Sequence, residues 1–319
     1  MALITVYNIH QACFFGKKIA YYCPVMTSFQ RKARTAEEAR GRRMLEKAPS
    51  VVWKRFTDGV ELRAHIIAPP GHTTDSFLPS VMFFFGGMWS LEFNEEFVSW
   101  AMHLASRGIV CILPEYRTRA CYDVPAQDII GDGLDAWRWV RHNAANLGID
   151  PELITLAGSD AGALLALNVA MQPMVETRKW WKLGSRDVPP PMPVSIAIFR
   201  GVVDVEAPEA RYLHIKADMP KTNSINPCAL LRRYLPPMFC AHGMADPLLD
   251  YGMREWFCEQ WRSFGNEAEI ILCPNSDHTL THFDVNPAVF EQVLLAWETF
   301  MAERGIWPES VIEDKTLMY

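Results

Sequence analysis

The chain has 319 residues, of which 50% are hydrophobic and 21% are charged, and its formal net charge is −6. This composition excludes a disordered or collagen-like chain, and the length suits one α/β domain with a sizeable core. Because the basic residues are interspersed with acidic ones rather than gathered in one run, the charge pattern also excludes a nucleic-acid-binding surface.

The N-terminal part differs from the rest of the chain. Residues 1–49 contain a basic, helix-prone stretch at 31–47 and no strand pattern, which predicts a helical arm or cap. From Ser50 onward the pattern changes to strands at 51–56 and 60–68, joined by the turn sequence Thr57-Asp58-Gly59. This arrangement predicts an antiparallel hairpin.

Buried strands and amphipathic helices then alternate along the chain. The predicted strands cover 81–85, 110–113, 154–157, 195–199, 238–241 and 269–273. The predicted helices cover 95–106, 125–146, 161–171, 251–264 and 287–304. This alternation predicts an α/β fold, with a mostly parallel sheet flanked by helices, over residues 50–305. We expect lid-like insertions near 172–193 and 204–227, and a C-terminal tail at 306–319.

The eight cysteines are scattered, with no C-x-x-C pair. They predict reduced thiols and a cytoplasmic protein. Residues 1–22 lack the basic region of a signal peptide, and no apolar stretch approaches the roughly 18 to 20 residues that cross a bilayer. We therefore expect no membrane span.

A strand, a tight glycine turn and an apolar helix meet at Gly158-Ser159-Asp160-Ala161-Gly162. This is the frame of a nucleophile elbow, GxSxG, which holds one side chain on a strained turn at a helix N-terminus. Asp160 stands at the middle position, where serine is usual. Because adjacent side chains diverge on so sharp a turn, we do not expect Ser159 to be a shifted nucleophile.

Two later strand ends carry an acid and a histidine. Asp246 follows the predicted strand 238–241, and His278 follows the predicted strand 269–273. Nucleophile, acid and histidine in this chain order are what the elbow's fold requires. We therefore predict a catalytic constellation of Asp160, Asp246 and His278, with His282 as the alternative base.

With these motifs the chain resembles the α/β-hydrolase superfamily, specifically its hormone-sensitive-lipase-like and acetyl-esterase-like branch, over residues 50–305. The resemblance rests on the elbow, on the segments 242–246 and 276–278, and on Phe84-Phe85-Gly86-Gly87-Met88-Trp89, which replaces the family's HGGGW-type loop. In the family, backbone amides of that loop and the amide after the nucleophile, here Ala161, hold the developing oxyanion. The resemblance therefore implies that Gly86, Gly87 and Met88 line this hole.

The loop departs from the family at Phe85 and Met88, its first and fourth positions. We expect Met88 to crowd the oxyanion pocket and to resist the backbone angles that glycine adopts. Phe85, Met88 and Trp89 would then form an apolar wall, which favours a small lipophilic substrate such as a polyketide- or terpenoid-like metabolite. Ordinary ester hydrolysis is disfavoured on this view, because a carboxylate is also a poor nucleophile at an acyl carbon.

Three functions remain open. Asp160 could attack an epoxide or alkyl halide to form an ester, which water activated by His278 then hydrolyses while Asp246 orients the histidine. Asp160 and His278 could instead act as an acid–base pair in cyclisation, elimination or isomerisation. The third alternative is a catalytically inactive binding protein, similar to the carboxylesterase-like gibberellin receptors of plants. No metal-ligand spacing or phosphate-binding loop is present, so no cofactor is implied, and a homodimer is left open.

Overall fold

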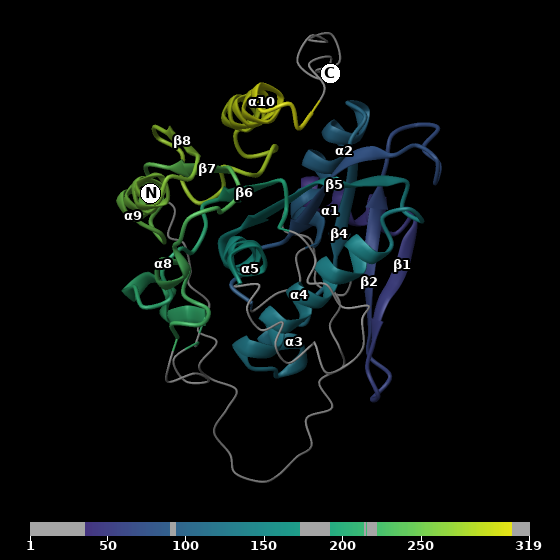
Figure 1. The fold of residues 1–319 in the computed structure, drawn as a ribbon, viewed down its shortest axis with the longest axis horizontal. Helices are drawn as coiled ribbons and strands as arrows, with labels where there is room; N and C mark the ends of the chain where they lie inside the picture. Colours follow the sequence, from purple (N-terminus) through teal and green to yellow (C-terminus); the bar gives the residue numbers. More distant parts are fainter. Residues whose placement is uncertain (1–35, 90–93, 173–191, 214, 216–221, 308–319) are drawn as a thin grey trace.

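The computed structural model describes residues 36–89, 94–172, 192–213, 215 and 222–307. An eight-stranded sheet with strand order β1-β2-β4-β3-β5-β6-β7-β8 forms its centre (Figure 1). The strand β2 runs antiparallel to both of its neighbours, and all other neighbouring strands are parallel. The strands are β1 (Ser50–Arg55), β2 (Glu61–Ile67), β3 (Leu78–Phe84), β4 (Val110–Pro114), β5 (Ile149–Ser159), β6 (Ser195–Phe199), β7 (Met238–Gly243) and β8 (Ala268–Cys273).

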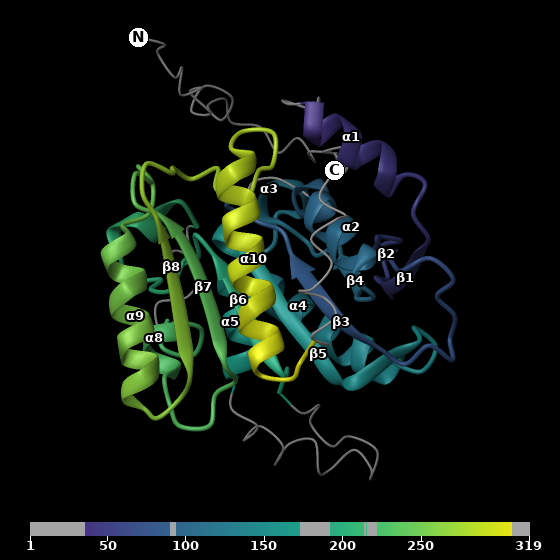
Figure 2. The same ribbon diagram turned by 90° about the horizontal axis from the view of Figure 1, so that it is seen from above.

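Helices cover both faces of the sheet. Figure 1 shows α2 and α10 on one side of it and α4 and α5 on the other, and Figure 2 shows α10 crossing in front of the strands. The helices are α1 (Ala36–Leu45), α2 (Val98–Ser106), α3 (Arg119–Tyr122), α4 (Ala126–His142), α5 (Asp160–Met171), α8 (Pro227–Leu230), α9 (Tyr251–Ser263) and α10 (Pro287–Glu303), with 3-10 helices η3 (Asn94–Phe97) and η6 (Pro208–Leu213).

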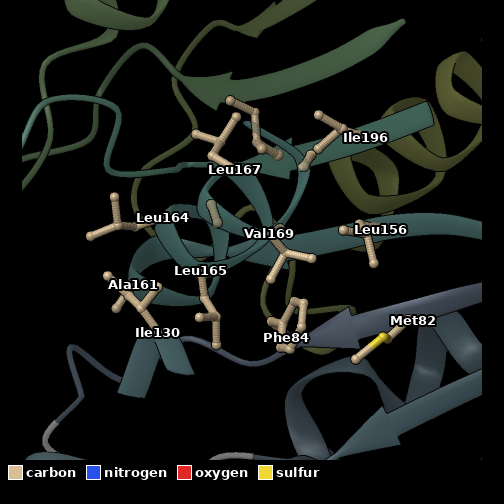
Figure 3. Packing of buried hydrophobic residues seen from close by; sticks show 14 of the residues in the cluster. Met82, Phe84, Ile130, Leu156, Ala161, Leu164, Leu165, Leu167, Val169 and Ile196 are labelled. Atoms are coloured by element: carbon tan, nitrogen blue, oxygen red, sulfur yellow. The ribbon is translucent and has the colours of Figure 1, made fainter. Parts of the chain in front are cut away.

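Strand alternation divides the hydrophobic core into two layers. In β3, Met82 and Phe84 pack into the layer that contains α4 and α5, whereas Val81 and Phe83 pack into the layer that contains α2 and α10. This follows from the two-residue period of a strand whose two faces are both covered. The helix α5 is buried on every side, and Figure 3 shows its side chains against those of neighbouring elements. This burial agrees with its mostly apolar sequence, in which Asp160 and Asn168 are the only polar side chains.

The predicted α/β architecture is confirmed, and each predicted strand and helix from residue 50 onward is present. The largest difference is in β5, which begins at Ile149 rather than at Ile154. In the predicted N-terminal arm, α1 lies within the helix-prone stretch, and residues 1–35 fall outside the described residues. Most of the predicted insertion at 172–193, part of that at 204–227 and nearly all of the tail also fall outside them.

The sheet register brings the ends of the central strands to one edge. Phe84 pairs with Gly158, Ser159 pairs with Phe199, and Phe199 pairs with Ala241. The strand β8 ends at the same level, where Cys273 pairs with Gly243. The loops that follow these strands therefore meet at the carboxyl edge, which is where sites form in open parallel sheets.

Candidate active site

The glycine turn after β5 has the geometry of an elbow. Asp160 is the first residue of α5 and has a φ of 50°, in the left-handed region that side chains other than glycine rarely adopt. The turn is also tightly packed, because a Cβ atom on Gly162 would lie 2.2 Å from the carbonyl oxygens of Phe84 and Phe85. Only glycine fits at that position.

The Asp160 carboxylate contacts the backbone of the loop after β3. Its Oδ2 atom accepts a hydrogen bond of 2.8 Å from the Met88 amide, and the residue is 2% exposed. The Ala161 amide lies in the first turn of α5, where amides have no partner within the helix and negative charge is favoured. The family resemblance predicts that the backbone amides of this loop hold an oxyanion. One of them, the Met88 amide, already donates its hydrogen bond to the Asp160 carboxylate.

The expectation for Met88 was wrong. Met88 adopts a φ of 56°, the left-handed conformation that it was expected to resist, and its side chain is 36% exposed. The Met88 amide faces Asp160, so Met88 contacts the elbow through its backbone.

Phe85 and Trp89, two of the residues predicted to form an apolar wall, both lie in the hydrophobic core. Phe85 is 2% exposed and stacks on Tyr116, whose hydroxyl donates a 2.6 Å hydrogen bond to the Phe85 carbonyl. Trp89 is 1% exposed and belongs to the same core layer. Both rings are therefore part of the core layer that contains α4 and α5.

Asp246 and His278 are brought together from the loops after β7 and β8. The His278 Nδ1 atom lies 2.7 Å from Asp246 Oδ2, and the Asp246 side chain is shielded from solvent. Asp246 is fixed in turn by the amides of Leu248 and Leu249, which donate hydrogen bonds of 2.8 and 3.1 Å to Oδ1. A carboxylate is an acceptor, so Nδ1 carries the proton and Nε2 is left as the basic nitrogen.

A second histidine contacts the same carboxylate. The Nε2 atom of buried His242 lies 3.3 Å from Asp246 Oδ2 and 3.0 Å from the Leu249 carbonyl oxygen. Burial raises the pKa of the Asp246 carboxyl, but hydrogen bonds from His242 and His278 and the charge of His278 outweigh it, so the pKa lies well below its usual value. Asp246 therefore remains ionised as the partner of His278.

Ser159 is buried and directed away from Asp160, at Glu96 in η3. Its hydroxyl donates a 2.5 Å hydrogen bond to Glu96 Oε1, and Glu96 Oε2 accepts one of 2.8 Å from the Gly86 amide. Arg200, which follows β6, pairs with the same carboxylate and donates to the His278 carbonyl oxygen at 2.5 Å and to Thr281 Oγ1 at 2.9 Å. Burial raises the pKa of Glu96, but the charges of Arg200 and His282 and these hydrogen bonds lower it overall.

Sequence reasoning did not find Glu96, Arg200 or Thr281. None of them stands in a motif. Apart from the Gly86 amide, ten residues before Glu96, the partners named here are 41 to 185 residues away in the chain. The second contact to Asp246 could have been suspected, because His242 stands four residues before it.

The described residues contain no group of His, Cys, Asp and Glu side chains that could hold a metal ion. Six cysteines lie within those residues, and all six are free thiols. No helix in the described part of the chain is long and apolar enough to cross a membrane.

Comparisons with known proteins find esterases among the chains that this one resembles. The chain is 31% identical over 231 residues to the carboxylesterase NlhH of Mycobacterium tuberculosis, covering 67% of this chain and 70% of that protein. The apo form of esterase 2 from Thermogutta terrifontis superposes with a TM-score of 0.73 at 25% identity, covering 82% of this chain and 97% of that one. These relatives are esterases, so they favour ordinary ester hydrolysis over the two chemistries expected from the sequence, and they give no support to a role in secondary metabolism.

The sequence model of the alpha/beta hydrolase fold matches residues 81–282, the segment that runs from β3 through the elbow and Asp246 to the histidine loop. The elbow after β5, Asp246 after β7 and His278 after β8 all fall within this matched segment. The chain therefore belongs to the α/β-hydrolase family.

Proposed function

We propose that this chain is an enzyme that acts on a small lipophilic molecule and hydrolyses an ester bond, with His278 as the base that activates water. The ester is either part of the substrate or formed between the substrate and the enzyme. The observation that carries the proposal is the 2.7 Å hydrogen bond between His278 Nδ1 and the shielded Asp246 carboxylate. A histidine held in this way presents Nε2 to a water molecule, takes up its proton and is stabilised as a cation by the carboxylate.

The first candidate for the ester is a carboxylic ester of the substrate itself, which the esterases among the relatives favour. Water that has lost a proton to His278 attacks the carbonyl carbon, and the alcohol leaves with the proton from His278. The Met88 amide can stabilise the carbonyl oxygen only after the Asp160 carboxylate has released it. Asp160 then has no covalent role.

The second candidate is an ester formed on Asp160, which the Met88 contact to Oδ2 favours. Because Oδ2 is held, Oδ1 is the atom that attacks a saturated carbon, and the bond from that carbon to an epoxide oxygen or a halide breaks. The halide leaves as an anion, whereas the epoxide oxygen takes a proton from water and becomes a hydroxyl. Water activated by His278 then attacks Cγ of the aspartyl ester. Negative charge develops on Oδ2, where the Met88 amide already donates, and the alcohol leaves with the proton from His278.

The test of the shared step is the replacement His278→Gln, measured against p-nitrophenyl butyrate, styrene oxide and 1-bromobutane. We expect the wild type to hydrolyse at least one of these probes and the variant to lose turnover on the order of 10²- to 10⁴-fold. The matched control is His142→Gln, an exposed histidine in the last turn of α4, for which we expect a loss smaller than about threefold. A wild type that binds a probe but turns over none of them would contradict the proposal and favour an inactive binding protein.

Asp160→Asn separates the two candidates. If the substrate supplies the ester, this variant retains turnover of p-nitrophenyl butyrate. If Asp160 supplies it, the variant loses turnover of styrene oxide or 1-bromobutane. In that case His278→Gln also accumulates a covalent adduct on the peptide that contains Asp160, which intact-protein and peptide mass spectrometry detect.

A further inference from the structure

Glu96 and Arg200 form a buried ion pair next to the candidate site. Neither residue was predicted to be catalytic. Glu96 is 4% exposed and Arg200 is 6% exposed, and both are charged groups that rarely lie so deep unless they are paired. Arg200 also has a φ of 42°, a strained conformation for a residue with a side chain. The fold thus keeps both an internal charge pair and a strained backbone at this point.

The two members of the pair contact different parts of the site. Glu96 accepts hydrogen bonds from the Gly86 amide in the loop after β3 and from the Ser159 hydroxyl at the elbow. Arg200 donates to the carbonyl oxygen of His278 and to the hydroxyl of Thr281, both in the loop after β8. The ion pair therefore links the loop after β3, the elbow and the histidine loop.

The backbone around Arg200 is fixed by the same neighbours. Its amide donates a 2.8 Å hydrogen bond to the Ala241 carbonyl oxygen at the end of β7. The Val202 amide donates one of 3.2 Å to the Asp160 carbonyl oxygen, and buried Arg254 donates one of 2.7 Å to the Gly201 carbonyl oxygen. These hydrogen bonds fix the backbone that carries the Arg200 guanidinium, which in turn contacts the His278 carbonyl oxygen.

We infer that Arg200 and Glu96 are positioning residues, which set His278 against the elbow and the loop after β3. The inference rests on the proposed function, because it assigns these contacts to the alignment of the proposed base. A planar guanidinium can donate to a carboxylate, a carbonyl and a hydroxyl at once in a fixed geometry, which a lysine cannot reproduce. Displacement of a catalytic group by about 1 Å is enough to lower a rate on the order of 10²-fold.

The first experiment compares Arg200→Met with the control Arg42→Met. Arg42 forms a buried pair with Glu95, the residue next to Glu96, at 2.8 Å, but that pair connects η3 to α1 rather than to the site. Both variants should lose stability in urea unfolding. We expect only Arg200→Met to lower kcat, on the order of 10²-fold, with KM for the same probe changed by less than about threefold.

A double variant, Arg200→Met with Glu96→Gln, keeps the test valid if Arg200→Met alone does not fold. Neutralising both members of a buried pair leaves no unpaired charge and is often close to neutral for stability. We expect the double variant to recover stability and to keep the low kcat. If the double variant or a folded Arg200→Met turns over the probe at the wild-type rate, the inference is overturned.

A spectroscopic readout separates this inference from the proposed function. The low-field proton NMR signal of His278 Nδ1–H, assigned by its absence in His278→Gln, reports the hydrogen bond to Asp246 without any substrate. We expect it to broaden or shift in the double variant and to persist in Arg42→Met. An unchanged signal would overturn the positioning role, whereas a wild type that shows the signal but turns over no probe overturns only the proposed function.

Discussion

Replacing Asp246 with asparagine tests how the proposed base is oriented. In the structure Oδ1 accepts two backbone hydrogen bonds, from Leu248 and Leu249, and Oδ2 accepts from His278. The backbone amides cannot change from donor to acceptor, so the amide oxygen of the new side chain must take the place of Oδ1. Its NH₂ group then faces His278, which forces Nδ1 to become an acceptor and moves the ring proton to Nε2.

A histidine with its proton on Nε2 cannot take a proton from water. We therefore expect Asp246→Asn to lower kcat on the order of 10⁴-fold, which corresponds to about 5 kcal/mol in the activation barrier. Loss of the charge-assisted hydrogen bonds should also lower the free energy of unfolding by about 1.5 to 3 kcal/mol.

The assay is steady-state turnover of whichever probe the wild type hydrolyses, together with urea unfolding of the same samples. Asp277→Asn is the matched control, because Asp277 is an exposed neighbour of His278 whose carboxylate accepts from Thr279 instead. We expect this control to retain turnover within about threefold. A loss of less than tenfold in Asp246→Asn would refute the reasoning about the histidine tautomer.

Three further predictions concern the turns and the buried charges. Met88→Gly should preserve turnover and raise stability by about 1 kcal/mol, because the left-handed φ favours glycine and the amide, not the side chain, faces Asp160; lost turnover would contradict this. In urea unfolding, Gly162→Ala should lower the free energy of unfolding by about 1 to 3 kcal/mol, because the added Cβ would contact backbone oxygens. Gly131→Ala in α4, where a Cβ meets nothing within 4 Å, should raise it by up to about 1 kcal/mol. The folded state depresses the pKa of Asp246, so its stabilising contribution is complete above the unfolded value near 3.9 and is lost as the pH falls below it. The difference in unfolding free energy between wild type and Asp246→Asn should accordingly shrink as the pH falls below about 4.

The sequence predicted the strands and the long helices because their patterns are local. The strand β6 is apolar from Ile196 to Phe199 and buried throughout, as expected for a strand covered on both faces. Asp246 and His278 lie in the loops that follow β7 and β8. The helices α3 and α8 were not predicted, because four residues are too few to show a helical period.

The errors at the site have a different cause. The prediction for Met88 assumed that a residue other than glycine resists the left-handed backbone conformation, but Met88 adopts it with a φ of 56°. Glu96 and Arg200 were missed because only the folded sheet brings η3 beside the end of β6. The residue types at the strand ends were enough to predict the candidate catalytic residues. The backbone geometry of the loops, which sets how these residues are oriented, was not predictable from residue type alone.

The most direct measurement of the central claim is a single turnover in H₂¹⁸O with enzyme in excess over probe, followed by mass spectrometry of the products and of the Asp160 peptide. If water activated by His278 cleaves an ester, one ¹⁸O appears in the released acid when the substrate supplies the ester, or in the Asp160 carboxylate when the enzyme does. Turnover that leaves ¹⁸O in neither place would contradict ester cleavage and favour acid–base chemistry without hydrolysis.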